Sequence, residues 1–203
     1  MDITSERSAD LSLVPANIDG ALVAKCAAML AADDVLAVTG CFDEMQFLSL
    51  SMQWSPTLSD IDDDLLNTLL TYWSDLPRGP RLPCSSDVDP VNFKSALGHV
   101  LLLDVEEGGW DYRYRVFGSS IAARAGFDAT GKLVSELPVQ PMAPFYLAVY
   151  RACLERFEPL YTRHVPPPDI QVTSWDRLAL PFEDGEGRIN RFLVGMVPGD
   201  WRE

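Results

Sequence analysis

The chain is short of positive charge. It carries 16 Lys and Arg against 30 Asp and Glu, which gives a formal net charge of −14. The acidic excess is concentrated near the N-terminus, because residues 1–64 hold 12 acidic and 2 basic residues. A negative chain repels the phosphate backbone of nucleic acids and the headgroups of anionic lipids. We therefore expect neither nucleic acid nor a membrane as a partner.

Long hydrophobic runs are also missing. The most apolar helical stretch, Ala21 to Val38, is interrupted by Lys25, Asp33 and Asp34, so it cannot span a bilayer. The opening MDITSERSADLS has acidic residues where a secretory signal has basic ones. The cysteines form no C-x-x-C pair, and scattered cysteines are mostly small buried side chains in a reducing compartment: Cys26, Cys41, Cys84 and Cys153. These features predict a cytoplasmic protein.

Histidine is scarce, since His99 and His164 are the two in the chain. Neither has a second metal ligand three or four residues away, so we expect no metal site. No G-x-S-x-G motif surrounds Ser119-Ser120, which leaves a Ser-His-Asp triad little support. We therefore predict a protein that is not an enzyme and has no catalytic residues. The alternative is a small hydrolase that uses His99 or His164 as its base.

The clearest pattern in the chain is a strict alternation from Trp110 to Gly118, WDYRYRVFG. Period-two alternation of aromatic and β-branched residues is typical of a half-buried strand. It predicts that the odd members of the set, Asp111, Arg113 and Arg115, face away from the even ones, which are Trp110, Tyr112, Tyr114 and Val116.

A second strand precedes this one and ends at Gly108-Gly109. Two glycines between strand-like runs favour a two-residue hairpin turn, because such turns need positive φ. That turn sets Asp104 opposite Arg113 and Leu103 opposite Tyr114. A four-residue loop would instead place Asp104 against Asp111, a like-charge pair.

Three helices are predicted from apolar residues that recur every three or four positions. The first runs from Asn17 to Leu36, with Asn17 or Asp19 near its start. The second, residues 59–76, begins at a Ser59 cap, carries acidic residues in its first turn and ends before Pro77. The third is Pro144 to Phe157.

Three more strands follow the last helix, and an earlier segment, Phe47 to Trp54, could be a strand or an extended arm. The three are Leu160 to Val165, Ile170 to Phe182 and Ile189 to Val197. Helices segregated beside an antiparallel sheet make an α+β domain. We divide the chain into an N-terminal helical extension, residues 1–58, and a domain, residues 59–203, that opens with the helix 59–76.

This order of elements resembles that of PAS domains, and the motifs resemble one proteobacterial PAS family in particular. Its pattern runs YW, LP, D.DP, LLDV, YRYRVFGS.I, G.D.TGK and W.RL.LPF. The matching positions are Tyr72-Trp73, Leu82-Pro83, Asp87, Asp89-Pro90, Leu102 to Val105, Tyr112 to Gly118, Gly126, Asp128, Thr130-Gly131, Trp175, Arg177, Leu178 and Leu180 to Phe182. The match spans roughly residues 65 to 197 and leaves residues 1–58 outside it.

The resemblance implies a five-stranded antiparallel sheet with helices on one face, acting as a sensory or protein-interaction module. It implies a signalling protein partner of unknown identity, because no output domain is recognisable in the sequence. No cofactor is carried over: the GRNCRFLQ motif of flavin photosensors is missing, and haem would have to use His164, which falls on a predicted strand.

Aromatic residues supply the candidate binding site. We expect a cavity between the sheet and the helices from Ser119 to Phe157, suited to a small, mostly apolar molecule. The predicted lining is Tyr114, Phe117, Phe127, Phe145, Tyr150, His164 and Trp175. The alternative is that these residues only fill the hydrophobic core.

The helix 59–76 carries an apolar surface wider than one docking face requires. We expect one side of it to pack on the outer face of the sheet, and the other to meet residues 17–54 or the same helix of a second subunit. A twofold dimer is a common way to cover such a surface, so we favour a homodimer. The predicted interface is Ile61, Leu65, Leu66, Leu69, Leu70 and Trp73.

Overall fold

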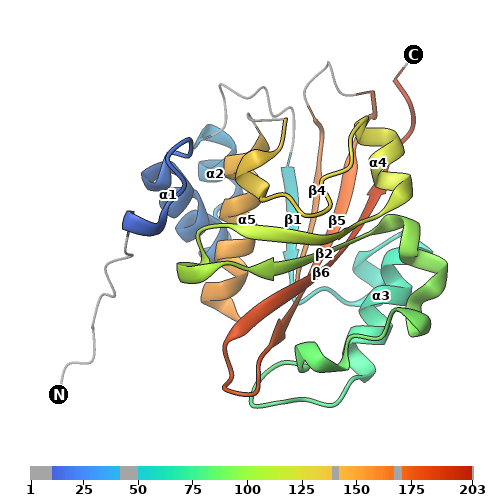
Figure 1. Cartoon of the computed structure of the whole chain (residues 1–203). Helices are drawn as coiled ribbons and strands as arrows, with labels where there is room; N and C mark the ends of the chain where they lie inside the picture. Colours follow the sequence, from blue (N-terminus) through green and yellow to red (C-terminus); the bar gives the residue numbers. More distant parts are fainter. Residues whose placement is uncertain (1–10, 42–49, 139–141, 167–170, 203) are drawn as a thin grey trace.

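A computed structural model of the chain describes residues 11–41, 50–138, 142–166 and 171–202 (Figure 1). Within these ranges six strands form one antiparallel sheet, in the order β1-β4-β5-β6-β2-β3. The strands are β1 (Leu50–Trp54), β2 (Val100–Val105), β3 (Tyr112–Phe117), β4 (Leu160–His164), β5 (Trp175–Glu183) and β6 (Ile189–Pro198). The α+β class is confirmed. The predicted number of five strands is one too few, because β1 adds to the β4 edge; residues 47–49 of the predicted segment lie outside the described residues.

Five α-helices accompany the sheet in the described ranges, and none of them is long and apolar enough to cross a membrane. They are α1 (Gly20–Ala31), α2 (Val35–Cys41), α3 (Asp64–Asp75), α4 (Ser119–Ala125) and α5 (Ala143–Arg156). Short 3₁₀ segments occupy most of the connections: Leu11–Leu13, Leu58–Asp60, Ser85–Asp87, Pro90–His99, Glu107–Gly109 and Val134–Glu136.

The helix starts follow from side-chain caps. Asp19 caps α1, as predicted, because its carboxylate accepts a hydrogen bond from the Leu22 amide. The predicted Ser59 start of α3 is wrong. Asp63 is the N-cap, and its Oδ1 accepts from the amides of Leu65 and Leu66 at 2.9 and 3.0 Å. Ser59 lies in a separate 3₁₀ turn, and the extended, buried Ile61 stands between the two helical segments.

The β2–β3 register is the predicted one. Leu103 pairs with Tyr114 and Asp104 with Arg113. Gly108 and Gly109 have the positive φ values, 75° and 66°, for which glycine was expected. The two-residue turn is wrong, however, because Glu107–Gly109 form a 3₁₀ turn inside a longer connection.

A β-bulge changes the alternation along β3. Leu103 pairs with Tyr114 but Leu102 pairs with Val116, so Arg115 is the extra residue. Beyond the bulge, each residue of β3 points to the face opposite to the one that strict alternation predicts. Val116, which was expected to face the core, is therefore 39% exposed. Asp111 also differs from the expected outward position, since it is buried and its carboxylate accepts a hydrogen bond from the Ser135 hydroxyl at 2.6 Å.

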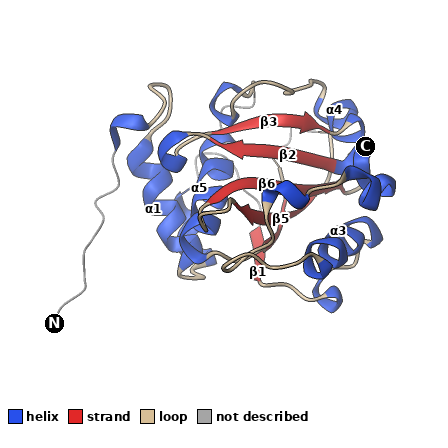
Figure 2. Cartoon of the chain, turned by 60° about the horizontal axis from the view of Figure 1, so that its bottom comes forward, coloured by secondary structure: helices blue, strands red, loops and turns tan. Residues whose placement is uncertain are grey.

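Helices cover both faces of the sheet (Figures 1 and 2). On β6, Phe192 faces α5, where its ring lies 5.3 Å from that of Tyr150. Gly195 faces the opposite way, and a Cβ there would lie 2.5 and 2.6 Å from atoms of Leu66 and Leu69 on α3. The α3 helix therefore packs on the outer face of the sheet, as expected, and α4 and α5 pack on the inner face. The strand between them, β5, is buried along its whole length.

Within the predicted N-terminal extension, α1 lies on the inner side of the sheet and β1 is an edge strand of the sheet. Helix α1 packs along α5, and the Trp54 indole nitrogen of β1 donates to the Leu30 carbonyl at 3.0 Å. The Arg156 guanidinium of α5 lies 4.5 Å from the Trp54 ring centroid and donates to the Ala31 carbonyl. The helix α1 of the extension is thus attached to α5, whereas Pro56, Thr57 and Leu58 lie beside α3.

Gly118, between β3 and α4, supplies a first prediction. A Cβ at this position would lie 2.4 Å from the Gly98 carbonyl oxygen and 2.8 Å from that of Val100, and backbone atoms cannot move aside as a side chain can. We expect Gly118→Ala to lower the free energy of unfolding by about 1–3 kcal/mol, as overpacking does. The matched control is Gly40→Ala in α2, where nothing lies within 4 Å and alanine should be neutral or stabilising. Urea denaturation measures both, and equal stability of the two variants would contradict the predicted contact.

Candidate ligand cavity

A cavity of about 50 Å³ lies between the inner face of the sheet and helices α4 and α5. Four of the seven predicted lining residues border it: Tyr114, Phe117, Phe127 and Trp175. The remaining lining is mostly aliphatic, with one charged side chain: Leu101, Ile121, Ala125, Leu137, Met142, Tyr146, Pro166, Arg177 and Met196. The structure thus places a cavity in the predicted layer of the fold, although with a different set of walls.

Three aromatic rings form one wall of the cavity. The centroids of Tyr114 and Phe117 are 5.3 Å apart, and those of Phe117 and Phe127 are 5.7 Å apart. The β-bulge at Arg115 explains how two residues three positions apart on β3 face the same side. Without that bulge Phe117 would point to the opposite face of the sheet.

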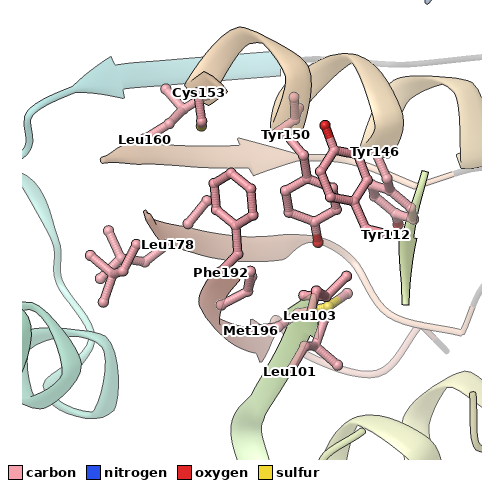
Figure 3. Close-up of a cluster of buried hydrophobic side chains, with 14 of the residues drawn as sticks. Leu101, Leu103, Tyr112, Tyr146, Tyr150, Cys153, Leu160, Leu178, Phe192 and Met196 are labelled. Atoms are coloured by element: carbon pink, nitrogen blue, oxygen red, sulfur yellow. The ribbon is translucent and has the colours of Figure 1, made fainter. Parts of the chain in front are cut away.

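Phe145 and Tyr150 do not border the cavity and belong to the packed core. Tyr150 has no exposed surface and its ring lies 4.9 Å from that of Tyr112 and 5.3 Å from that of Phe192. Figure 3 shows Tyr150 projecting from α5 towards Phe192 on the sheet. For Phe145 and Tyr150 the core interpretation of the aromatic set was therefore the right one.

His164 is also outside the cavity lining. Its side chain is fully buried on β4, with its ring 5.5 Å from that of Phe145 and 6.1 Å from that of Tyr146. Burial and the positive charge of Arg177 lower the pKa of His164 to about 3. A neutral, enclosed imidazole of such low basicity is a poor general base at neutral pH.

His99 gives the hydrolase alternative little more support. It is half-buried at the end of the 3₁₀ segment Pro90–His99, and its Nδ1 has no hydrogen-bond partner among the described residues. A catalytic histidine is normally oriented by a carboxylate or carbonyl at that nitrogen. The described part of the chain also contains no group of three His, Cys, Asp or Glu side chains that could hold a metal.

Cys153 occupies the core side of α5, as the sequence indicated. It has no exposed surface, and burial raises the pKa of its thiol well above the ordinary value. The thiol is therefore protonated and inaccessible, which removes the basis for nucleophilic or redox chemistry at this position.

The sequence analysis missed Arg177 as a site residue. It is the third residue of β5, is 3% exposed and borders the cavity. Its Nη2 donates to the Tyr150 hydroxyl, and its guanidinium carbon lies 4.1 Å from the centroid of the Tyr146 ring. The signal was present in the alternation Trp175, Arg177, Ala179, which places an arginine on the inward face of a buried strand. It was overlooked because the lining was chosen for aromatic character.

The apolar surface of α3 is covered by its own chain. Of the six predicted interface residues, Leu65 is half-buried and the others are buried within the single chain: Ile61, Leu66, Leu69, Leu70 and Trp73. The Trp73 indole nitrogen donates to the Pro181 carbonyl at 2.8 Å, and Tyr72 packs on Phe93 of the segment Pro90–His99 at 4.9 Å. The second partner of α3 is thus this 3₁₀ segment, which was not considered. The exposed surface on which the dimer contact was argued is therefore not available.

Comparisons with known proteins fit this architecture. A family model described as a PAS domain matches residues 62–193. A solved structure described as an RNA-binding light-oxygen-voltage receptor has 13% identity and a TM-score of 0.44, over 88% of this chain and 53% of that one. This chain thus spans about half the length of that protein. No curated protein matches the sequence significantly. Because the family model covers well over half of the sequence, the chain belongs to the PAS domain family.

Proposed function

We propose that the protein is a sensory module that holds a small, mostly apolar molecule in the cavity beside α4 and α5 and signals by contact with another protein. The cavity carries the proposal, because its walls come from the sheet and from both inner helices. A molecule bound there touches elements that are far apart in the sequence. Binding can thus alter how these elements pack and what surface they present to a partner. Membership of the PAS family supports a sensory role.

A non-enzymatic role accords with the chemistry of the described residues. His164 is buried with a pKa near 3, and the Cys153 thiol is buried and protonated. The described residues that line the cavity include neither histidine nor cysteine. We propose that binding, rather than turnover, is what this cavity performs.

We also propose that the protein forms a homodimer, now through a surface other than α3. The apolar faces of α3 and α5 are already buried against other parts of the same chain. The dimer contact would therefore use side chains that are exposed in the single chain. Light scattering at tens of micromolar protein decides the oligomeric state directly, and the mass of a single chain, 22.5 kDa, would overturn the proposal.

A molecule that co-purifies with the protein tests the binding role. We expect extraction and mass spectrometry of the purified chain to release one, and Ala125→Phe to lose it. Ala125 is half-buried on α4 and borders the cavity, so a phenyl ring there occupies the ligand volume. The control is Ala123→Phe, an exposed position of the same helix.

The stability of Ala125→Phe separates the two interpretations of the cavity. If the cavity is an empty packing defect, filling it should leave the thermal midpoint unchanged or raise it. If the cavity is occupied, the variant should lose the bound molecule and with it the stabilisation that ligands give. A stabilised variant and an extract without any small molecule would favour a purely structural adaptor.

A further inference from the structure

Arg177 is a buried charge that the described residues leave incompletely satisfied. Its guanidinium has a pKa far above neutrality and is always protonated in proteins. No carboxylate among the described residues forms an ion pair with it. Its Nη2 donates to Tyr150, but its Nη1 is buried and has no hydrogen-bond partner in the described part of the chain. A buried charge without an opposite charge is costly, and it persists where something else pairs with it.

The neighbouring residue on β5 shows the contrast. Asp176 faces the other side of the strand and is paired with Arg163 by two hydrogen bonds of 2.7 and 2.9 Å. Among the described residues, the carboxylate of Asp176 thus has a counter-charge, and the adjacent guanidinium of Arg177 has none. The rings of Tyr146 and Tyr150, with centroids 4.1 and 5.5 Å from the guanidinium carbon, give it only the weaker cation–π attraction.

Arg177 borders the cavity of the proposed function. We propose that the cavity binds a small monocarboxylate, with the carboxylate on Arg177 and the apolar part against the aliphatic and aromatic walls. Two parallel hydrogen bonds from a guanidinium match the two oxygens of a carboxylate. This inference rests on the cavity of the proposed function and names the chemical class of its ligand.

Charge favours this class over phosphates, and the size of the cavity limits the acid to a few atoms. Among the described residues, Arg177 is the one charged side chain in the cavity wall, so it would neutralise half the charge of a doubly charged phosphate, within a chain of net charge −14. A cavity of about 50 Å³ accommodates a molecule of roughly three to five non-hydrogen atoms, since one water needs ~10–15 Å³ by this measure. Acids of the size of acetate or propionate fit it without any movement of the walls.

Titration calorimetry with sodium propionate tests the assignment on the whole chain, after removal of any co-purified molecule. We expect propionate to bind with a dissociation constant on the order of 1 mM or below, because so few atoms limit the affinity. Propionamide, which has the same shape without the charge, should bind at least tenfold more weakly. Decanoate should not bind in the same range if the cavity keeps its size.

Arg177→Met removes the charge and keeps an unbranched apolar side chain, a change that proteins often tolerate at buried charges. We expect at least a tenfold loss of propionate affinity with the fold retained by circular dichroism. The control is Arg188→Met, whose side chain is 72% exposed in the β5–β6 turn and should leave binding unchanged. Arg177→Lys keeps the charge but lacks the two parallel donors of the guanidinium, so it should bind propionate with intermediate affinity. This variant provides a second test if the Met variant does not fold.

The outcomes separate this inference from the proposed function. Equal affinity for propionate and propionamide, or unchanged propionate binding by Arg177→Met, would show that the guanidinium is structural. Either result would overturn the carboxylate assignment while a bound neutral molecule would still support the sensory cavity. If the wild-type chain binds no propionate and releases no small molecule on extraction, both proposals fail.

Discussion

Leu69→Ala is expected to lower the free energy of unfolding by about 2–5 kcal/mol, the range for removing a fully buried leucine. The side chain has no exposed surface and lies against the backbone of Gly195, where even a Cβ would come within 2.6 Å of its Cδ1. This contact attaches α3 to the outer face of β6. Alanine would leave a cavity at the point of closest approach, and urea denaturation followed by circular dichroism measures the loss.

Leu65→Ala is the matched control on the same helix. Leu65 is half-buried, so the same truncation should cost about 1 kcal/mol. We expect the particle mass from light scattering to be the same for both variants and the wild type. A near-wild-type stability of Leu69→Ala together with a smaller particle would place Leu69 in a subunit contact instead.

The sequence was informative wherever a local rule determined the structure. Alternation and glycine placed β3 opposite β2 in the correct register, because a one-residue slip would have moved every side chain to the wrong face. The boundaries of the last three strands and of α5 were right to within about five residues, since helices and strands of that length carry a strong periodic pattern.

The errors arose where tertiary contacts made the choice. Nothing in the local pattern marks Arg115 as a bulge, yet the bulge alone decides that Phe117 faces the cavity and Val116 faces solvent. The cap was expected at Ser59, but Ile61 is extended and buried, and Asp63 caps α3 instead.

The candidate site was half predictable for a related reason. The layer that contains the cavity follows from the order of elements, but the walls depend on which aromatic side chains find partners in the core. Tyr150 and Phe145 pack against other rings of the core and leave no space between them. The cavity lies instead beside the residues that include Arg177. A buried strand with one charged residue on its inward face is the pattern that would have identified Arg177.

The protein is expected to lose stability steeply in mild acid because of His164. Its pKa in the folded chain is lowered to about 3, whereas an unfolded histidine titrates near its ordinary value of 6.5. Between these values the unfolded chain binds a proton that the folded chain does not, so acid favours unfolding. The stability contribution is thus fully present above pH 6.5 and is lost as the pH falls towards 3.

The size of this effect follows from the displacement of the pKa. Each unit corresponds to about 1.4 kcal/mol, so the total reaches at most about 5 kcal/mol between pH 6.5 and 3. We expect urea denaturation of the wild type at pH 7, 5.5 and 4.5 to show this loss on top of that caused by the carboxylates. His164→Leu cannot titrate, so its stability should fall less steeply, by up to about 1.4 kcal/mol per pH unit.

Two further variants identify the cause. Arg177→Met removes the positive charge that helps to lower the pKa of His164. The stability that this variant loses on acidification should therefore lie between the losses of the wild type and of His164→Leu. His99→Leu removes the other histidine of the chain, which is half-buried, and serves as the control for loss of an imidazole elsewhere. Carboxylates contribute equally in all four proteins, so the differences between their slopes isolate the imidazole. Identical slopes for the wild type and His164→Leu would mean that the folded chain accepts a proton on His164 near its ordinary pKa, and that the buried guanidinium of Arg177 exerts no effective field on it.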